Sequence, residues 1–150
     1  MTTPSYHASL EWKGTHGVLQ APDRPPLTVS ARRAFGGDGD AWSPGELLVG
    51  AIASSLMSTF AALAEGSRIH LAGCSCSAVG TIGPTEAGWA LTNVAVCFDV
   101  SVEREADRAL VDQLMVEARE KSVVASSFRW DLTLESVITV AARAAGVGAR

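Results

Sequence analysis

The chain has 150 residues, of which 47% are hydrophobic and 19% are charged, with a net charge of −4. This apolar content supports a folded core and excludes an intrinsically disordered chain, and the absence of a basic run excludes ordinary nucleic-acid binding. The length fits a single domain. We predict a core over residues 5–141 and a frayed tail over 142–150.

The cellular compartment is indicated by the cysteines and by the first residues. Three cysteines are an odd number, which argues against a secreted disulfide framework and favours reducing surroundings. Residues 1–6 do not combine a charged region with an apolar run, so a signal peptide is not expected. The sequence therefore predicts a cytoplasmic protein.

The first third of the chain is predicted to be β structure. Residues 5–20 read as a hairpin with its turn at 14–17, because apolar and polar side chains alternate in its first strand. The apolar members of this half-buried strand are Tyr6, Ala8, Leu10 and Trp12. A proline-rich loop follows, then a third strand at 27–35 and a glycine-rich loop at 36–41.

A long central helix is predicted from Ser43 to about Glu65, ended by Gly66. Ser43 is a suitable N-cap, Pro44 suits the first helical position, and Glu46 completes a capping box. Residues 47–64 are uncharged, which makes this segment a marginal candidate for a membrane span. Serines interrupt it and no cluster of basic residues flanks it, so we predict a buried helix of a soluble protein and no membrane contact.

The remaining elements indicate an α+β fold rather than a parallel α/β fold. Strands are predicted at 69–82, 90–102 and 131–141, and a second helix at 105–121. The order βββ-α-ββ-α-β with hairpins gives mostly antiparallel sheets around the two helices. The side chains expected to face inward on the last two strands are Val94, Val96, Phe98, Val100, Val102, Leu132, Leu134, Ile138 and Val140. The second helix is expected to bury Ala106, Leu110, Val111, Leu114, Met115 and Ala118.

The uncharged central helix predicts a homodimer. A helix without charges on any side needs protein on most of its faces, and one small sheet with one other helix offers little cover. We therefore expect the helix to pack against its counterpart in a second copy. Small residues would allow the close approach: Gly50, Ala51, Ser54, Ser55, Ser58 and Ala61.

Three segments together resemble the OsmC/Ohr family. Residues 43–56, SPGELLVGAIASSL, are similar to that family's SPxELLLAALASCL segment, and Gly36-Gly37 precede them. Residues 120–128, EKSVVASSF, resemble its KCPVxNSL segment, and Trp12-Lys13-Gly14 resembles its W-x-G turn. The order of elements matches over about residues 5–141. The resemblance implies an intertwined α+β homodimer and thiol-dependent reduction of organic hydroperoxides in the oxidative stress response.

The chain departs from this family at both redox positions. The resemblance places the peroxidatic cysteine at Ser55 and the resolving cysteine at Ser122. A thiolate reduces a peroxide and becomes a sulfenic acid, which a second thiol converts into a disulfide, and a serine hydroxyl cannot follow this route. The family also pairs its thiol with an Arg and a Glu. Glu46 is a candidate, with Arg32, Arg33 or Lys13 as the cation. A plain capping box for Glu46 and a solvated strand end for Arg32 and Arg33 are the favoured explanations.

Three readings of the function stay open. The first is a non-peroxidatic dimer that binds a small hydrophobic or hydroperoxide-like molecule, or acts structurally. The second is an active hydroperoxide reductase that uses Cys74, Cys76 or Cys97, and the third is a scaffold with a filled pocket. Cys74 and Cys76 should share a strand face with His70, but C-x-C is not a zinc or thioredoxin spacing, so we expect buried structural cysteines. No cofactor or metal is expected, and without a G-x-S-x-G elbow Ser55 is not expected to be a hydrolase nucleophile.

Overall fold

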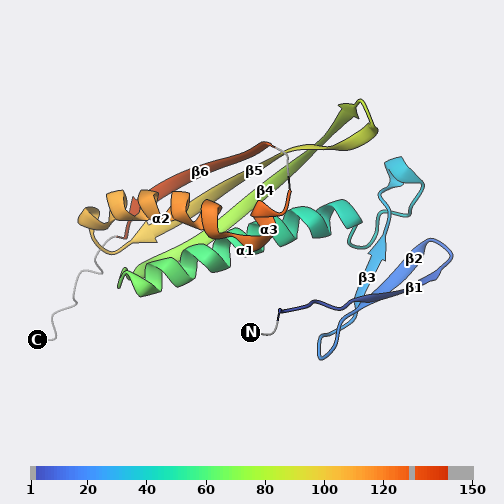
Figure 1. Ribbon diagram of the computed structural model, residues 1–150, viewed down its shortest axis with the longest axis horizontal. Helices are drawn as coiled ribbons and strands as arrows, with labels where there is room; N and C mark the ends of the chain where they lie inside the picture. Colours follow the sequence, from blue (N-terminus) through green and yellow to red (C-terminus); the bar gives the residue numbers. More distant parts are fainter. Residues whose placement is uncertain (1–2, 129–130, 142–150) are drawn as a thin grey trace, which may run out of the picture. The chain divides into compact units, whose positions relative to one another are not determined.

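A computed structural model describes residues 3–128 and 131–141 (Figure 1). The chain forms two compact units that divide between Leu48 and Val49, and each is described by itself. The predicted order of strands and helices is confirmed, and the fold is α+β. The predicted tail over 142–150 lies outside the described residues.

The first unit holds a three-stranded antiparallel sheet. Its strands are β1 (Ser9–Lys13), β2 (His16–Gln20) and β3 (Leu27–Ser30), in the order β1-β2-β3. The hairpin of residues 5–20 is thus confirmed, but its first strand is not half-buried. Leu10 and Trp12 are 52% and 54% exposed. Both side chains lie over Gly17, where an added Cβ would come within 2.6 Å of the Trp12 ring. They therefore pack against the backbone of the neighbouring strand and not into a hydrophobic core.

The third strand is shorter than predicted. It ends at Ser30, and Arg33–Phe35 instead form the 3₁₀ turn η1, which Gly36 ends with a left-handed φ of 81°. Gly37 then lies so close to the carbonyl of Ala31 that a Cβ there would be only 1.9 Å from its oxygen. The chain must turn here because only glycine fits against that backbone.

Helix α1 (Pro44–Gly66) begins at the predicted capping box. The Ser43 amide donates to Glu46 Oε2 at 2.9 Å, and the Glu46 amide donates to Ser43 Oγ at 3.3 Å. These two reciprocal bonds satisfy amide groups that the first turn of a helix leaves without a partner. The predicted start and end of the helix are confirmed.

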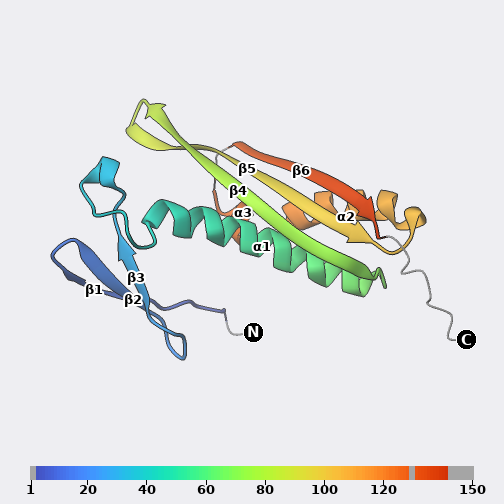
Figure 2. The same cartoon turned by 180° about the vertical axis from the view of Figure 1, so that it is seen from behind.

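The second unit is a three-stranded sheet covered by helices on one face. Its strands are β4 (Leu71–Thr85), β5 (Gly88–Val102) and β6 (Asp131–Val140), in the order β4-β5-β6. Strands β4 and β5 are antiparallel, whereas β5 and β6 are parallel. Helices α1 and α2 (Arg108–Lys121) lie on the same face of this sheet, as the two opposite views show (Figures 1 and 2).

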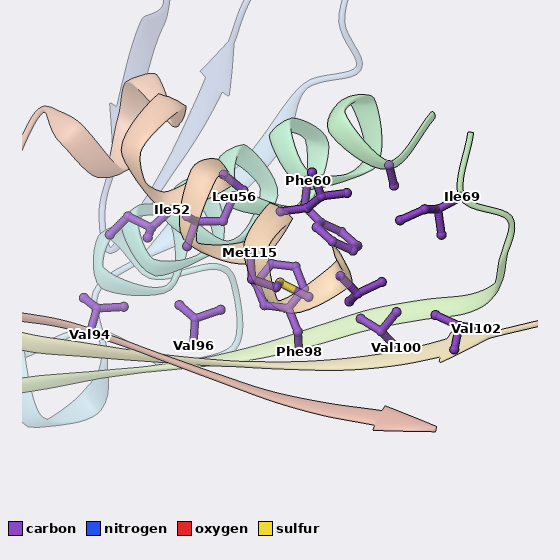
Figure 3. Packing of buried hydrophobic residues seen from close by; sticks show 14 residues of the cluster. Ile52, Leu56, Phe60, Ile69, Val94, Val96, Phe98, Val100, Val102 and Met115 are labelled. Carbon is purple, nitrogen blue, oxygen red and sulfur yellow. The ribbon is translucent and has the colours of Figure 1, made fainter. Parts of the chain in front are cut away.

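The core lies between this sheet face and the two helices. The predicted inward residues of β5 are all buried, and they meet a stripe of α1 that recurs every fourth residue (Figure 3). The stripe consists of Ile52, Leu56, Phe60 and Ala64. The rings of Phe60 and Phe98 meet edge to face, with centroids 5.7 Å apart. Helix α2 adds Val111, Leu114, Met115 and Ala118 to the same core.

Helix α1 is covered on one side only in the single chain, as expected from the little cover that one sheet and one other helix can offer. Only its stripe toward the sheet is buried, and its exposed residues include most of the small ones noted in the sequence: Gly50, Ala51, Ser54, Ser58 and Ala61. By length and composition the helix could cross a membrane, and 22% of its most apolar stretch is buried inside the chain.

Smaller differences occur in the second unit. Residues 105–107 form a separate 3₁₀ turn, η2, and the short helix α3 (Val123–Ser126) was not predicted. The hairpin turn between β4 and β5 is only two residues long, because the strands pair as far as Thr85 and Gly88. Ala106 is exposed, and Val140 keeps the register of the core face but is 37% exposed at the end of β6.

Candidate functional site

Ser55 on α1 and Ser122 at the end of α2 face each other inside the second unit. Their hydroxyl oxygens lie 2.8 Å apart and share a hydrogen bond. Ser122 is fully buried and Ser55 is partly buried. The two positions that the family resemblance selected, 67 residues apart in sequence, are thus brought into direct contact.

The backbone around Ser122 explains why this side chain is fixed. Ser122 ends α2, where its amide donates to the carbonyl of Ala118 at 2.9 Å, and it also begins α3. Its Oγ accepts a hydrogen bond from the amide of Ala125 at 3.4 Å. The Ser122 hydroxyl oxygen thus accepts a hydrogen bond from a backbone amide of α3 and also shares a hydrogen bond with the Ser55 hydroxyl of α1.

The hydroxyl of Ser55 differs from its neighbours on α1. Ser54, Ser58 and Thr59 donate to carbonyl groups one turn back in the helix, and both Ser58 and Thr59 donate to the carbonyl of Ser55. That local bond is the usual choice for a hydroxyl in a helix. Ser55 instead makes a long-range bond to Ser122, and this contact ties α1 to the junction of α2 and α3.

The chemistry open to this pair is that of two neutral hydroxyls. Each can donate and accept hydrogen bonds, but neither has the oxidation sequence of a thiol. The 2.8 Å between the two oxygen atoms is an ordinary hydrogen-bond distance. The arrangement is therefore a pair of hydroxyls joined by one hydrogen bond.

Arg32 and Glu46 form an ion pair in the first unit. Arg32 Nη2 donates to Glu46 Oε1 at 2.9 Å, while Oε2 of the same carboxylate completes the capping box with Ser43. The ion-pair and capping interpretations of Glu46 therefore hold at the same time. The amide of Ser43, followed by Arg32, lowers the pKa of Glu46 from 4.5 to about 2. This carboxylate is ionised at any physiological pH.

The structure distinguishes among the three candidate cations. Arg32 pairs with Glu46, whereas Arg33 donates from Nε to the carbonyl oxygen of Asp38 at 2.9 Å and closes the glycine-rich loop. Lys13 is exposed at the end of β1. Arg32 is therefore the cation that matches the Arg–Glu pairing expected from the resemblance.

The three cysteines do not form one group, and none of them is buried. Cys74 is exposed, and Cys76 and Cys97 are intermediate. Cys76 is paired with Phe98 and faces the core side, whereas Cys97 is paired with Ser77 and faces the opposite side of the sheet. Burial raises the pKa of both Cys74 and Cys76, which reduces their thiolate fraction.

The prediction that His70 belongs to the same strand as Cys74 and Cys76 is wrong. His70 precedes β4, and the pairing of β4 with β5 is irregular between Leu71 and Gly73. The period-two argument that placed His70 on the face of Cys74 does not cross such an irregularity.

One cluster in the first unit was missed from the sequence. His16 Nε2 lies 2.7 Å from Asp40 Oδ1, and Nδ1 of the same ring lies 3.1 Å from the Thr15 hydroxyl, which in turn donates to Asp38. The hydrogen bond with His16 lowers the pKa of Asp40. The acidic residues of the glycine-rich loop were the only hint, since the partners are more than 20 residues apart in sequence.

This cluster borders a hollow of about 480 Å³. The hollow is lined by His16, Leu27, Thr28, Asp40, Ala41 and Trp42. His16, Asp38 and Asp40 offer ligand atoms within 4.8 Å of one another. Their contacts with one another fasten the turn of the first hairpin to the glycine-rich loop, which is a structural role.

Comparisons with known proteins point to one family. A family model described as OsmC-like protein matches residues 37–136. This range contains the serine pair and the start of α1. A comparison with curated proteins finds no match.

Solved structures share the fold over nearly the whole chain at low sequence identity. An OsmC-like protein of unknown function from Vibrio cholerae is 17% identical with a TM-score of 0.83, over 90% of this chain and 100% of that one. An organic hydroperoxide resistance protein from Legionella pneumophila is 20% identical with a TM-score of 0.74, over 93% and 100%. A further organic hydroperoxide resistance protein, from Elizabethkingia anophelis, is 15% identical with a TM-score of 0.74, over 93% and 99%.

Proposed function

Because the chain belongs to the OsmC-like family, we propose that it is a non-peroxidatic member, a homodimer that binds a small hydrophobic molecule without reducing it. The observation that carries this proposal is the hydrogen bond between Ser55 and Ser122. Similar structures are named as organic hydroperoxide resistance proteins, so we place the function in the oxidative stress response.

The serine pair supports binding rather than turnover. A hydroxyl is a poor nucleophile at neutral pH and does not take up a peroxide oxygen, so the reductive half of the family chemistry lacks its reagent. Residues next to the serines in sequence belong to the apolar core or pack against it: Leu56, Val124 and Ala125. Such a setting suits a small apolar molecule that carries one hydrogen-bonding atom.

The exposed face of α1 supports the homodimer. An apolar helix with one buried stripe and a row of small exposed residues can approach a second helix closely, and burial of that face would stabilise the pair. The buried stripe packs against β5 in the same core as α2, and we therefore prefer a soluble dimer to a membrane span. A reducing cytoplasm suits its three free cysteines.

Reduction of hydroperoxides by Cys74 or Cys76 is the alternative. Their shared position on the core side of β4 favours it. Their raised pKa values weigh against it, because the thiolate is the reactive form. Cys97, on the opposite face of the sheet, cannot resolve a sulfenic acid formed on either of them without rearrangement.

A peroxidase assay separates the two functions. The purified protein is mixed with cumene hydroperoxide and dithiothreitol, and hydroperoxide loss is followed beside a variant with Cys74, Cys76 and Cys97 all changed to Ser. We expect equal rates, no higher than without protein. A thiol-dependent rate seen only with the native chain would establish the alternative.

Binding is tested with 2-phenyl-2-propanol, the alcohol that corresponds to cumene hydroperoxide and cannot oxidise a thiol. We expect it to displace an anilinonaphthalene fluorophore from the native protein and not from Ser55→Leu, whose side chain would occupy the site. Ser75→Leu, a change at an exposed position on the other face of the sheet, is the matched control. Equal displacement from both variants would contradict a binding site at Ser55.

A further inference from the structure

Both cysteines of the C-x-C segment of β4 have sulfur contacts with helix α1. The Sγ atom of Cys74 lies 3.3 Å from the Sδ atom of Met57. The Sγ atom of Cys76 lies 3.9 Å from the carbonyl oxygen of Ala53, one helical turn before Met57. Both cysteines of the C-x-C segment therefore face the same side of the same helix.

The strand register keeps these two thiols together and excludes the third. Cys74 is paired with Val100 and Cys76 with Phe98, and both partners point into the core between sheet and helices. Residues two apart on a strand share a face. Cys97 is paired with Ser77 and lies on the other face. A change of Cys97 can therefore serve as the control for changes of Cys74 and Cys76.

The two thiols are poorly placed for a disulfide and well placed for a shared ion. Residues two apart on a strand have Cα atoms about 6.6 Å from each other, close to the upper limit of about 6.8 Å for a disulfide. All three cysteines are free. An ion between two sulfur atoms bridges a longer distance than a direct S–S bond.

The ligand types select the ion. Thiolates and thioethers are soft ligands that favour Cu(I), whereas Zn²⁺ prefers four ligands from Cys, His and carboxylates. Two thiols with a thioether at 3.3 Å from one of them form a sulfur-only set. Cys74 is exposed and Met57 is intermediate, so an ion can reach the set from solvent.

We propose that Cys74, Cys76 and Met57 form a binding site for a soft monovalent cation, Cu(I) or Ag(I). On binding, each thiol releases its proton to solvent and forms one sulfur–metal bond, and the Met57 thioether donates a lone pair. The metal keeps its oxidation state, so the step needs no oxidant or reductant. The site does not depend on the serine pair or on the function proposed above.

The test is an anaerobic titration of the 150-residue chain with Cu(I), in competition with the chromogenic chelator bicinchoninate. We expect one ion per chain for the native protein and for Cys97→Ser. Loss of an outer partner of a metal site costs about 10–100-fold in affinity, so loss of a direct ligand in Cys74→Ser or Cys76→Ser should cost at least that. Met57→Leu, which keeps the size of the side chain, should weaken binding by about tenfold.

Further measurements distinguish this site from non-specific binding of the metal to any thiol. Circular dichroism of each variant shows whether the fold is kept, and Ag(I) should compete with Cu(I) for the same single site. The proposal is overturned if Cys97→Ser weakens Cu(I) binding as much as Cys74→Ser, or if Met57→Leu binds like the native chain. Binding of Zn²⁺ as tight as that of Cu(I) would also overturn it.

Discussion

The hydroxyl oxygens of Ser55 and Ser122 lie 2.8 Å apart, although one residue belongs to the middle of α1 and the other to the junction of α2 and α3. The contact joins the two helices that cover the sheet. It occupies the positions where the OsmC-like family is expected to carry its redox thiols. The same relationship therefore bears on both the function and the stability of the chain.

Restoring both sulfur atoms should restore the redox pair. In Ser55→Cys with Ser122→Cys, one equivalent of hydroperoxide should form a sulfenic acid and then a disulfide, releasing an alcohol and water. We expect the loss of two titratable thiols after peroxide treatment and a dithiothreitol-dependent peroxidase rate. The single variant Ser55→Cys is the control and should form no such disulfide. A double variant that keeps all its thiols would show that the two positions are not the family's redox pair.

Removal of the buried hydroxyl should destabilise the second unit. Ser122→Ala leaves the amide of Ala125 and the hydroxyl of Ser55 without their present partner. Unsatisfied buried polar groups cost about 1–3 kcal/mol, and we expect a loss of this size in the free energy of unfolding by urea. Ser126→Ala, at an exposed position one turn later, should change it by less than about 0.5 kcal/mol. Equal effects of the two changes would argue against the hydrogen bond.

Acid should weaken the fold through Glu46. Its pKa is about 2 in the folded chain against 4.5 for the free group, so the folded state favours the ionised form. The resulting stabilisation is complete above the unfolded pKa and is lost as the pH falls from there toward 2. Glu46→Gln should therefore lower stability at neutral pH and flatten its decline in acid, measured by thermal unfolding across this range. Glu65→Gln, at the other end of α1, is the matched control for loss of one carboxylate from the helix.

The aromatic contact between α1 and β5 should anchor the core. Phe60 and Phe98 are both fully buried, and their rings meet at 5.7 Å. Phe60→Ala should cost about 3–5 kcal/mol of unfolding free energy because of the cavity it leaves. A double-mutant cycle with Phe98→Leu should give a coupling of about 0.5–1.5 kcal/mol. A coupling of zero would mean that the two rings contribute only through their separate burial.

The exposed face of α1 should carry the dimer contact. A carboxylate at Ser58, an exposed position on the side away from the sheet, would be buried without a partner in a helix–helix interface. We therefore expect Ser58→Glu to sediment as a monomer where the native chain sediments as a dimer. Thr81→Glu, on an exposed position of β4, should leave the dimer intact. A native chain that sediments as a monomer at micromolar concentration would contradict the proposed homodimer.

Local sequence patterns were sufficient for most of the elements. The alternation of valines in β5, the capping box at Ser43 and the glycine at the end of α1 act over a few residues, so their effects are visible without the rest of the chain. Local patterns gave wrong strand ends where contacts outside the local pattern determine the backbone conformation. The third strand ends early because Gly37 packs on the backbone of Ala31, and the period-two pattern of β4 does not reveal its irregularity near Leu71.

The candidate site shows the same division. The chemical identity of the side chains, two hydroxyls where the family resemblance expects thiols, could be read directly, because it depends on residue type and order alone. Which of Arg32, Arg33 and Lys13 pairs with Glu46 could not be read in this way, since all three are cations and only the folded chain decides which one reaches the carboxylate. Likewise the contact of Cys74 with Met57 and the separation of Cys97 follow from strand register and helix packing. Those distances result from burying one helix stripe against one sheet face, an arrangement that the whole core determines together.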